Sequence, residues 1–108
     1  MSQPFAARAL VSTVGDLHAW TRAIMHGQFI RAGALERATT RGVLADGSET
    51  RYGFGWGLPD SRGLRAIAHG GAIHGFNSFM AYYPAIDATV VVLANSLANF
   101  NVDSNRVA

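Results

Sequence analysis

The amino-acid sequence predicts an α+β fold, in which an N-terminal amphipathic helix packs on an antiparallel meander of three to four strands. Three observations support this prediction: helical periodicity near the N-terminus, strand-like segments in the second half, and short turns between those segments. Short connections favour antiparallel neighbours, because parallel strands need a longer crossover. With 108 residues, of which 49% are hydrophobic and 15% charged, the chain is expected to form a single domain with one core.

The helical periodicity lies in the first third of the chain. A helix is expected over residues 13–26, because Thr13 can cap its N-terminus, Asp16 can return the bond, and Gly27 supplies a stop. Spacings of three and four residues predict its apolar face. This face would consist of Val14, Leu17, Trp20 and Ile24. A second, short helix is expected over residues 32–40.

Strand-like sequence follows the turn signal at residues 46–48. The expected strands span residues 52–58, 64–69, 76–83 and 88–95. In the first of them, large apolar side chains alternate with glycines, which indicates a bulky face and a bare face that another backbone approaches closely. A glycine-rich loop is the alternative for this segment. In the last strand every position from Val90 to Leu93 is apolar, which predicts coverage on both faces.

Charge and composition exclude several classes of function. The nine basic residues are all arginines, scattered from Arg8 to Arg106, so a nucleic-acid interface is not expected. No stretch approaches the roughly 20 apolar residues of a membrane span, and the start of the chain lacks the pattern of a signal peptide. A soluble protein without a membrane partner is therefore expected, and its compartment is left unknown.

Metal and cofactor chemistry is not expected either. The chain has no cysteine, which removes thiolate nucleophiles and cysteine-ligated metals. Its histidines lack metal-ligand spacing, since His69 and His74 are separated by glycines, and His18 and His26 lie two helical turns apart without an acidic third ligand.

The most informative stretch runs from His69 to Ser78 and contains three of the twelve glycines. Glycines at the end of a strand let a ligand lie against the backbone, whose N–H groups can then stabilise developing negative charge. A glycine-rich hairpin turn with incidental histidines explains the same stretch. The residues alone leave both interpretations open.

Four segments carry a family resemblance: residues 10–17 (LVSTVGDL), 52–57 (YGFGWG), 69–78 (HGG followed by GFNS) and 90–95 (VVVLAN). On these segments, the run from Ala7 to Asn99 resembles the C-terminal part of the serine β-lactamase, D-alanyl-D-alanine peptidase and esterase family. The resemblance implies that residues 1–108 form a partial β-lactamase-like domain.

The resemblance also implies a site. In this family a Ser-x-x-Lys segment, a Tyr-x-Asn-like loop and a Lys/His-x-Gly triplet build the active site, and the triplet alone is recognisable in this chain. His69 would take the place of the basic residue of the triplet, and the backbone N–H of Ala72 would be one of two oxyanion donors. Gly70 and Gly71 would line the substrate, and His74 would border the site or cap the turn.

Two features bear on activity. The sequence contains no lysine, so none of its serines can head a Ser-x-x-Lys motif, and no Gly-x-Ser-x-Gly elbow occurs that would present a serine to His69 or His74. The chain is therefore expected to be inactive alone. Gly70 and Ala72 stand where penicillin-recognising members tend to carry hydroxyls, which favours a small ester or amide substrate over a β-lactam.

A function of another class is the alternative. The chain could be a non-catalytic binding or assembly module whose apolar sheet face recruits another chain. In either case, open strand edges predict a homo-oligomer or association through the exposed sheet.

Overall fold

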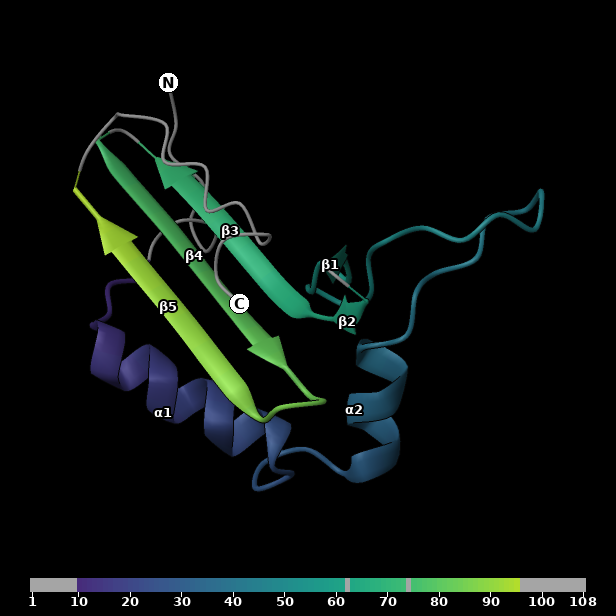
Figure 1. Cartoon of the computed structure of the whole chain (residues 1–108), viewed down its shortest axis with the longest axis horizontal. Helices are drawn as coiled ribbons and strands as arrows, with labels where there is room; N and C mark the ends of the chain where they lie inside the picture. The colour runs from purple at the N-terminus through teal and green to yellow at the C-terminus, as the bar shows by residue number, and fades with distance from the viewer. Residues whose placement is uncertain (1–9, 62, 74, 96–108) are drawn as a thin grey trace.

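The computed structural model describes residues 10–61, 63–73 and 75–95. Its elements are α1 (Val14–Met25), α2 (Ala32–Ala38), β1 (Asp60–Ser61), β2 (Leu64–Arg65), β3 (Ile67–Ile73), β4 (Phe76–Tyr83) and β5 (Ala88–Ala94). Strands β3, β4 and β5 form an antiparallel sheet in that order, and α1 packs along β5 (Figure 1). The α+β class, the meander and the packed helix predicted from the sequence are confirmed. Neither described helix is long and apolar enough to cross a membrane.

Helix α1 begins as the sequence predicts, and its buried face keeps Ile24 of the predicted face, at 7% exposed, but adds Thr21. The Oγ1 atom of Thr13 accepts a hydrogen bond from the backbone N–H of Asp16 at 3.1 Å, and Gly27 takes a φ of 75° just after the helix. Val14 and Trp20 are nearly half exposed, whereas Thr21 is 1% exposed. The hydroxyl of Thr21 donates to the Leu17 carbonyl at 2.7 Å, and this bond lets a polar side chain enter the core.

The strand expected over residues 52–58 is not formed. The N–H of Gly53 donates to the Trp56 carbonyl at 2.8 Å, so the chain turns back on itself, with a φ of 78° at Gly55. The alternation of faces is lost as a result: Phe54 is 70% exposed, and Leu58 is fully buried. The predicted close backbone approach does occur, because a Cβ on Gly53 would lie 2.2 Å from the Ala38 carbonyl oxygen.

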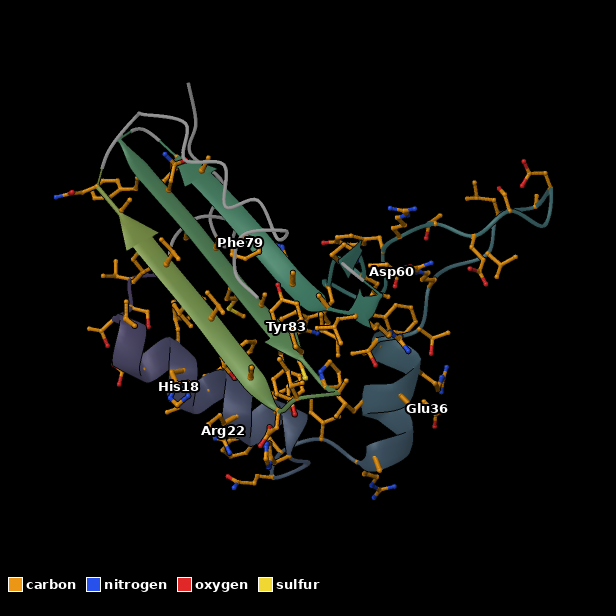
Figure 2. The ribbon with its side chains drawn as sticks, in the orientation of Figure 1. His18, Arg22, Glu36, Asp60, Phe79 and Tyr83 are labelled. Carbon is orange, nitrogen blue, oxygen red and sulfur yellow. The ribbon has the colours of Figure 1, made fainter. Side chains whose placement is uncertain are left out.

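Each face of the sheet carries its own cluster of buried residues. On the α1 face, Ile67 and Tyr82 pack with Trp56 and Leu58, and Trp20 stacks on Trp56 with ring centroids 5.8 Å apart. On the opposite face, the buried residues are Ala66, Ala68, Ala81 and Tyr83. Phe79 packs against this second cluster from the same strand as Tyr83 (Figure 2). Strand β5 stays half-buried along most of its length, so the full coverage expected for its apolar run is not reached.

The glycine-rich stretch forms the β3–β4 hairpin, with Gly70 and Gly71 inside strand β3 and Gly75 in the turn. The strand expected over residues 64–69 is interrupted at Ala66, where β2 ends, and then continues as β3 through to Ile73. Gly70 pairs with Phe79 and Gly71 with Ser78 in the β3–β4 ladder. In the described part of the hairpin turn, Gly75 has a φ of 79°.

Candidate active site

The direction of the β3 backbone groups follows from one short contact outside the sheet. Both backbone groups of Ala68 bond to Gly57: its N–H donates to the Gly57 carbonyl at 2.8 Å, and its carbonyl accepts from the Gly57 N–H at 2.6 Å. In an antiparallel ladder, successive residues direct these groups to opposite edges of the strand. Ala68 therefore faces away from β4, and so do Gly70 and Ala72, two and four residues further along.

The residue predicted as an oxyanion donor is thus placed on the outer edge of the strand. The N–H of Ala72 is directed away from β4, along the edge that Gly57 occupies further back. An N–H held on a rigid strand and pointed out of the sheet can donate to a developing oxyanion without reorganisation. The structure therefore directs the Ala72 N–H off the outer edge of the sheet.

The side chain of His69 leaves the strand on the α1 face. His69 pairs with Met80, and the Thr21 hydroxyl lies 3.9 Å from the Met80 sulfur, so cross-strand neighbours on this row face α1. His69 itself is exposed. The strand thus brings together an exposed imidazole on one face and an outward N–H three residues on, while His74 lies outside the described residues.

The two glycines of the triplet differ in how much room they have. A Cβ on Gly71 would lie 2.7 Å from the Ser78 Oγ, whereas a Cβ on Gly70 would lie 3.7 Å from the nearest atom, the Ser78 carbonyl oxygen. A side chain at position 71 would displace the Ser78 hydroxyl, which can rotate, whereas a Cβ at position 70 would make only ordinary van der Waals contact. A residue with a side chain at position 70 would fit the fold.

A cleft lies at the C-terminal end of β3. It has a volume of about 760 Å³, and Gly71 and Ala72 are among its walls. Ile73, Phe76 and Leu93 line it from the sheet, and residues 10–12 line it from the segment before α1. These wall residues were not predicted as site residues. The signal available in the sequence was the apolar pair Leu10–Val11, which precedes the helix cap and belongs to no predicted apolar face.

A second cavity, of about 440 Å³, lies at the opposite end of the sheet, where β3 begins and β4 ends. Its walls include Met25 of α1, Leu35 of α2, and Ile67 and Tyr82 of the sheet. Ile67 is the first residue of β3, five positions from Ala72. The larger cleft is therefore the one next to the candidate oxyanion donor.

Asp87, in the turn between β4 and β5, joins α1 to the sheet and was missed from the sequence. Its carboxylate accepts hydrogen bonds from the Tyr82 hydroxyl at 2.8 Å and from His26 Nε2 at 3.0 Å, and it lies 3.7 Å from the Arg22 guanidinium, which extends from α1 (Figure 2). The hydrogen bonds from Tyr82 and His26 hold the pKa of Asp87 below its usual value, while burial raises the pKa of Tyr82. Four separated positions thus form one cluster at this end of the helix.

Asp87→Asn is expected to reduce the loss of stability at acid pH. Because the folded pKa of Asp87 is depressed, the unfolded chain binds more protons as the pH falls, so the stabilisation is present above about pH 4 and is lost as the pH drops through the folded pKa. Asparagine tolerates the φ of 47° at this position, so the backbone is kept.

Urea denaturation midpoints at pH 7 and pH 3 measure this effect. The difference between the two midpoints should be smaller in Asp87→Asn than in the unmodified chain. Glu36→Gln is the control, because within the described residues no ion pair involves Glu36. An equal change in both variants would show that Asp87 has no specific role.

Comparison with known proteins decides the family. The family model described as Beta-lactamase matches residues 2–108, almost the whole chain. The chain belongs to the β-lactamase family of serine hydrolases. This membership confirms the resemblance read from the sequence.

Individual relatives in the β-lactamase family are similar over part of their length. Unguisins hydrolase ungD of Aspergillus violaceofuscus is 28% identical over 88% of this chain and 20% of its own length. Penicillin-binding protein 4* of Bacillus subtilis is 31% identical over 78% of this chain and 19% of its own length. D-aminopeptidase of Brucella ovis is 30% identical over 62% of this chain and 13% of its own length. The chain thus spans a fifth or less of the relatives that it matches.

Proposed function

We propose that this chain is the part of a β-lactamase-like serine hydrolase that supplies one oxyanion donor, the N–H of Ala72, and the basic residue His69 of the triplet. The observation that carries the proposal is the direction of the β3 edge, fixed by the two hydrogen bonds between Ala68 and Gly57. That direction turns the Ala72 N–H outward, toward the position where an acyl oxygen would be held. The second donor would be the backbone N–H of the nucleophile.

The nucleophile is proposed to lie on polypeptide other than these 108 residues. The sequence contains no lysine, so no Ser-x-x-Lys segment occurs in it. A positioned N–H and a histidine cannot by themselves form an acyl-enzyme intermediate, because its formation needs an activated nucleophile. The chain is therefore proposed to be catalytically silent until that segment is brought to the outer edge of β3.

An ester or amide is proposed as the substrate in preference to a β-lactam. The residues at positions 70 and 72, glycine and alanine, carry no hydroxyl that could donate to a substrate carboxylate. Space does not explain the glycine at position 70, because a Cβ would fit. The absence of a hydroxyl at this position is thus a property of the site and not a demand of packing.

Combination of the chain with the polypeptide that carries Ser-x-x-Lys, in one reading frame or as a second chain, tests this function. With the isolated chain, p-nitrophenyl acetate is expected to hydrolyse at its uncatalysed background rate. With the combination, the hydrolysis rate is expected to rise above that background. Replacement of the motif serine by alanine should return the rate to background. Full esterase activity of the isolated chain would refute the proposal, and faster hydrolysis of a chromogenic cephalosporin than of the ester would refute the preference.

A further inference from the structure

We infer that the cleft at the end of β3 binds the acyl group of the substrate, and that this group is uncharged, apolar and larger than acetyl. The inference rests on the proposed hydrolase function and adds to it the chemical class of the acyl side. Three properties of the cleft carry it: its position beside the oxyanion edge, the absence of charge in its described walls, and its size.

The position of the cleft follows from the strands that form it. Gly71, Ile73 and Phe76 belong to the two strands that flank the hairpin turn, and Leu93 comes from β5. In the ladder, Gly71 pairs with Ser78 and Ser78 with Leu93, and Ile73 pairs with Phe76, so all of these side chains share the α1 face. These wall positions therefore lie on one face of the sheet, and Ala72, Asn77 and Ala94 line the cleft from the alternate positions.

The cleft adjoins the candidate oxyanion donor. Ala72 is one of its walls, and its N–H is directed off the outer edge of the same strand. When the carbonyl oxygen of a substrate accepts a hydrogen bond from that N–H, its acyl carbon lies beside Ala72 and next to Gly71, the preceding residue. The Ser78 hydroxyl lies over Gly71, 2.7 Å from where a Cβ would be, so the acyl chain passes over the strand into the cleft when that hydroxyl rotates away.

The described walls carry no charged side chain, which favours a neutral acyl group. The residues that line the cleft are of the types Leu, Val, Ile, Phe, Ala, Gly, Ser and Asn, and none of them is charged. The described walls hold no counter-ion for an ionised carboxylate or ammonium, and only neutral serine and asparagine side chains could replace its hydration. A neutral acyl group incurs no such cost and can cover the exposed apolar side chains of Leu10, Val11 and Phe76, which are 95%, 97% and 60% exposed.

Size excludes the smallest acyl groups as the best fit. Ligand pockets commonly have volumes of roughly 300–1,000 Å³, and the cleft, at about 760 Å³, lies within that range. An acetyl group would leave most of the apolar wall in contact with water. Each additional methylene that it covers is worth about 0.8 kcal/mol, which corresponds to about fourfold in affinity.

Methyl NMR of the 108-residue chain tests the inference without catalysis. The chain is labelled at leucine, valine and isoleucine methyls and titrated with acetamide, hexanamide and the monoamide of glutaric acid, a charged amide of similar length. Hexanamide is expected to shift the methyls of Leu10, Val11, Ile73 and Leu93 and to bind at least about tenfold more tightly than either of the other amides. The methyls of Ile86, at the far end of the sheet, should stay unchanged.

A matched pair of variants separates the cleft from general hydrophobicity. Phe76→Ala is expected to weaken hexanamide binding by roughly fivefold, because it removes an apolar wall. Ile86→Ala, which removes a side chain of similar exposure (59% against 60%), should leave it unchanged. The ratio of kcat/KM for p-nitrophenyl hexanoate to that for the acetate, measured on the combined enzyme, should fall in Phe76→Ala by a similar factor.

Three results would overturn the inference. One is equal binding of hexanamide and acetamide, and another is tight binding of the charged amide. The third is that the chemical shifts of the cleft methyls change with protein concentration and not with amide concentration, because a second copy of the chain would then occupy the cleft. Hexanamide binding with a combined enzyme that shows no hydrolysis would instead overturn the proposed hydrolase function.

Discussion

Ala72→Pro is expected to lower kcat for ester hydrolysis in the combined enzyme by about 10²- to 10³-fold, the usual effect of removing one oxyanion donor. Proline removes the backbone N–H and nothing else that the sheet needs. The Ala72 N–H points away from β4, so the ladder loses no hydrogen bond, and proline is tolerated at edge positions of this kind. The residue before it is Gly71, which accommodates the restricted conformation that proline imposes on its neighbour.

Ala72→Gly is the matched control, because it changes the same position and keeps the N–H. Its kcat should stay within a few-fold of the unmodified enzyme, and both variants should keep the far-UV circular dichroism of the parent. A folded Ala72→Pro enzyme that retains the parental kcat would show that this N–H does not stabilise the transition state. The oxyanion role would then have to be assigned to another donor.

The sequence predicted elements whose pattern is local. Residues 76–83 and 88–95 alternate or run apolar between clear turn signals, and β4 and β5 occupy these segments to within one residue. Helix α1 was predicted to within one residue at each end, because Thr13 and Gly27 act through bonds to nearby backbone. The burial of Ile24 was predicted, but that of Thr21 was not, because Thr21 enters the core through a hydrogen bond that hydrophobicity does not describe.

Features that depend on distant parts of the chain were missed. The segment over residues 52–58 alternates like a strand, yet Gly53 and Phe54 dock on the end of α2, and that partner cannot be seen in the local pattern. The Asp87 cluster joins residues 61 positions apart in the chain. The sequence did point to Ala72 through the family resemblance, but the direction of its N–H depends on the bridge between Gly57 and Ala68.

Gly53→Ala is expected to destabilise the fold by roughly 3 kcal/mol, the upper end of the usual cost of overpacking. The new Cβ would lie 2.2 Å from the carbonyl oxygen of Ala38 and 3.2 Å from its carbonyl carbon. These are backbone atoms, so no side-chain rotation can relieve the contact. Moving the loop away would also break the bond that the Phe54 N–H donates to the same carbonyl at 2.9 Å, at the C-terminal end of α2.

Two other glycines separate this clash from the general effects of adding a methyl group. Gly55 lies in the same loop with a φ of 78° and no atom within 4 Å of an added Cβ, so Gly55→Ala should cost only the backbone strain, about 1 kcal/mol. Gly15 lies in α1 with equal room and helical φ, so Gly15→Ala should gain up to about 1 kcal/mol. Urea denaturation should therefore give the highest stability for Gly15→Ala, a lower one for Gly55→Ala and the lowest for Gly53→Ala. If Gly53→Ala is no less stable than Gly55→Ala, the loop does not dock on the C-terminal end of α2.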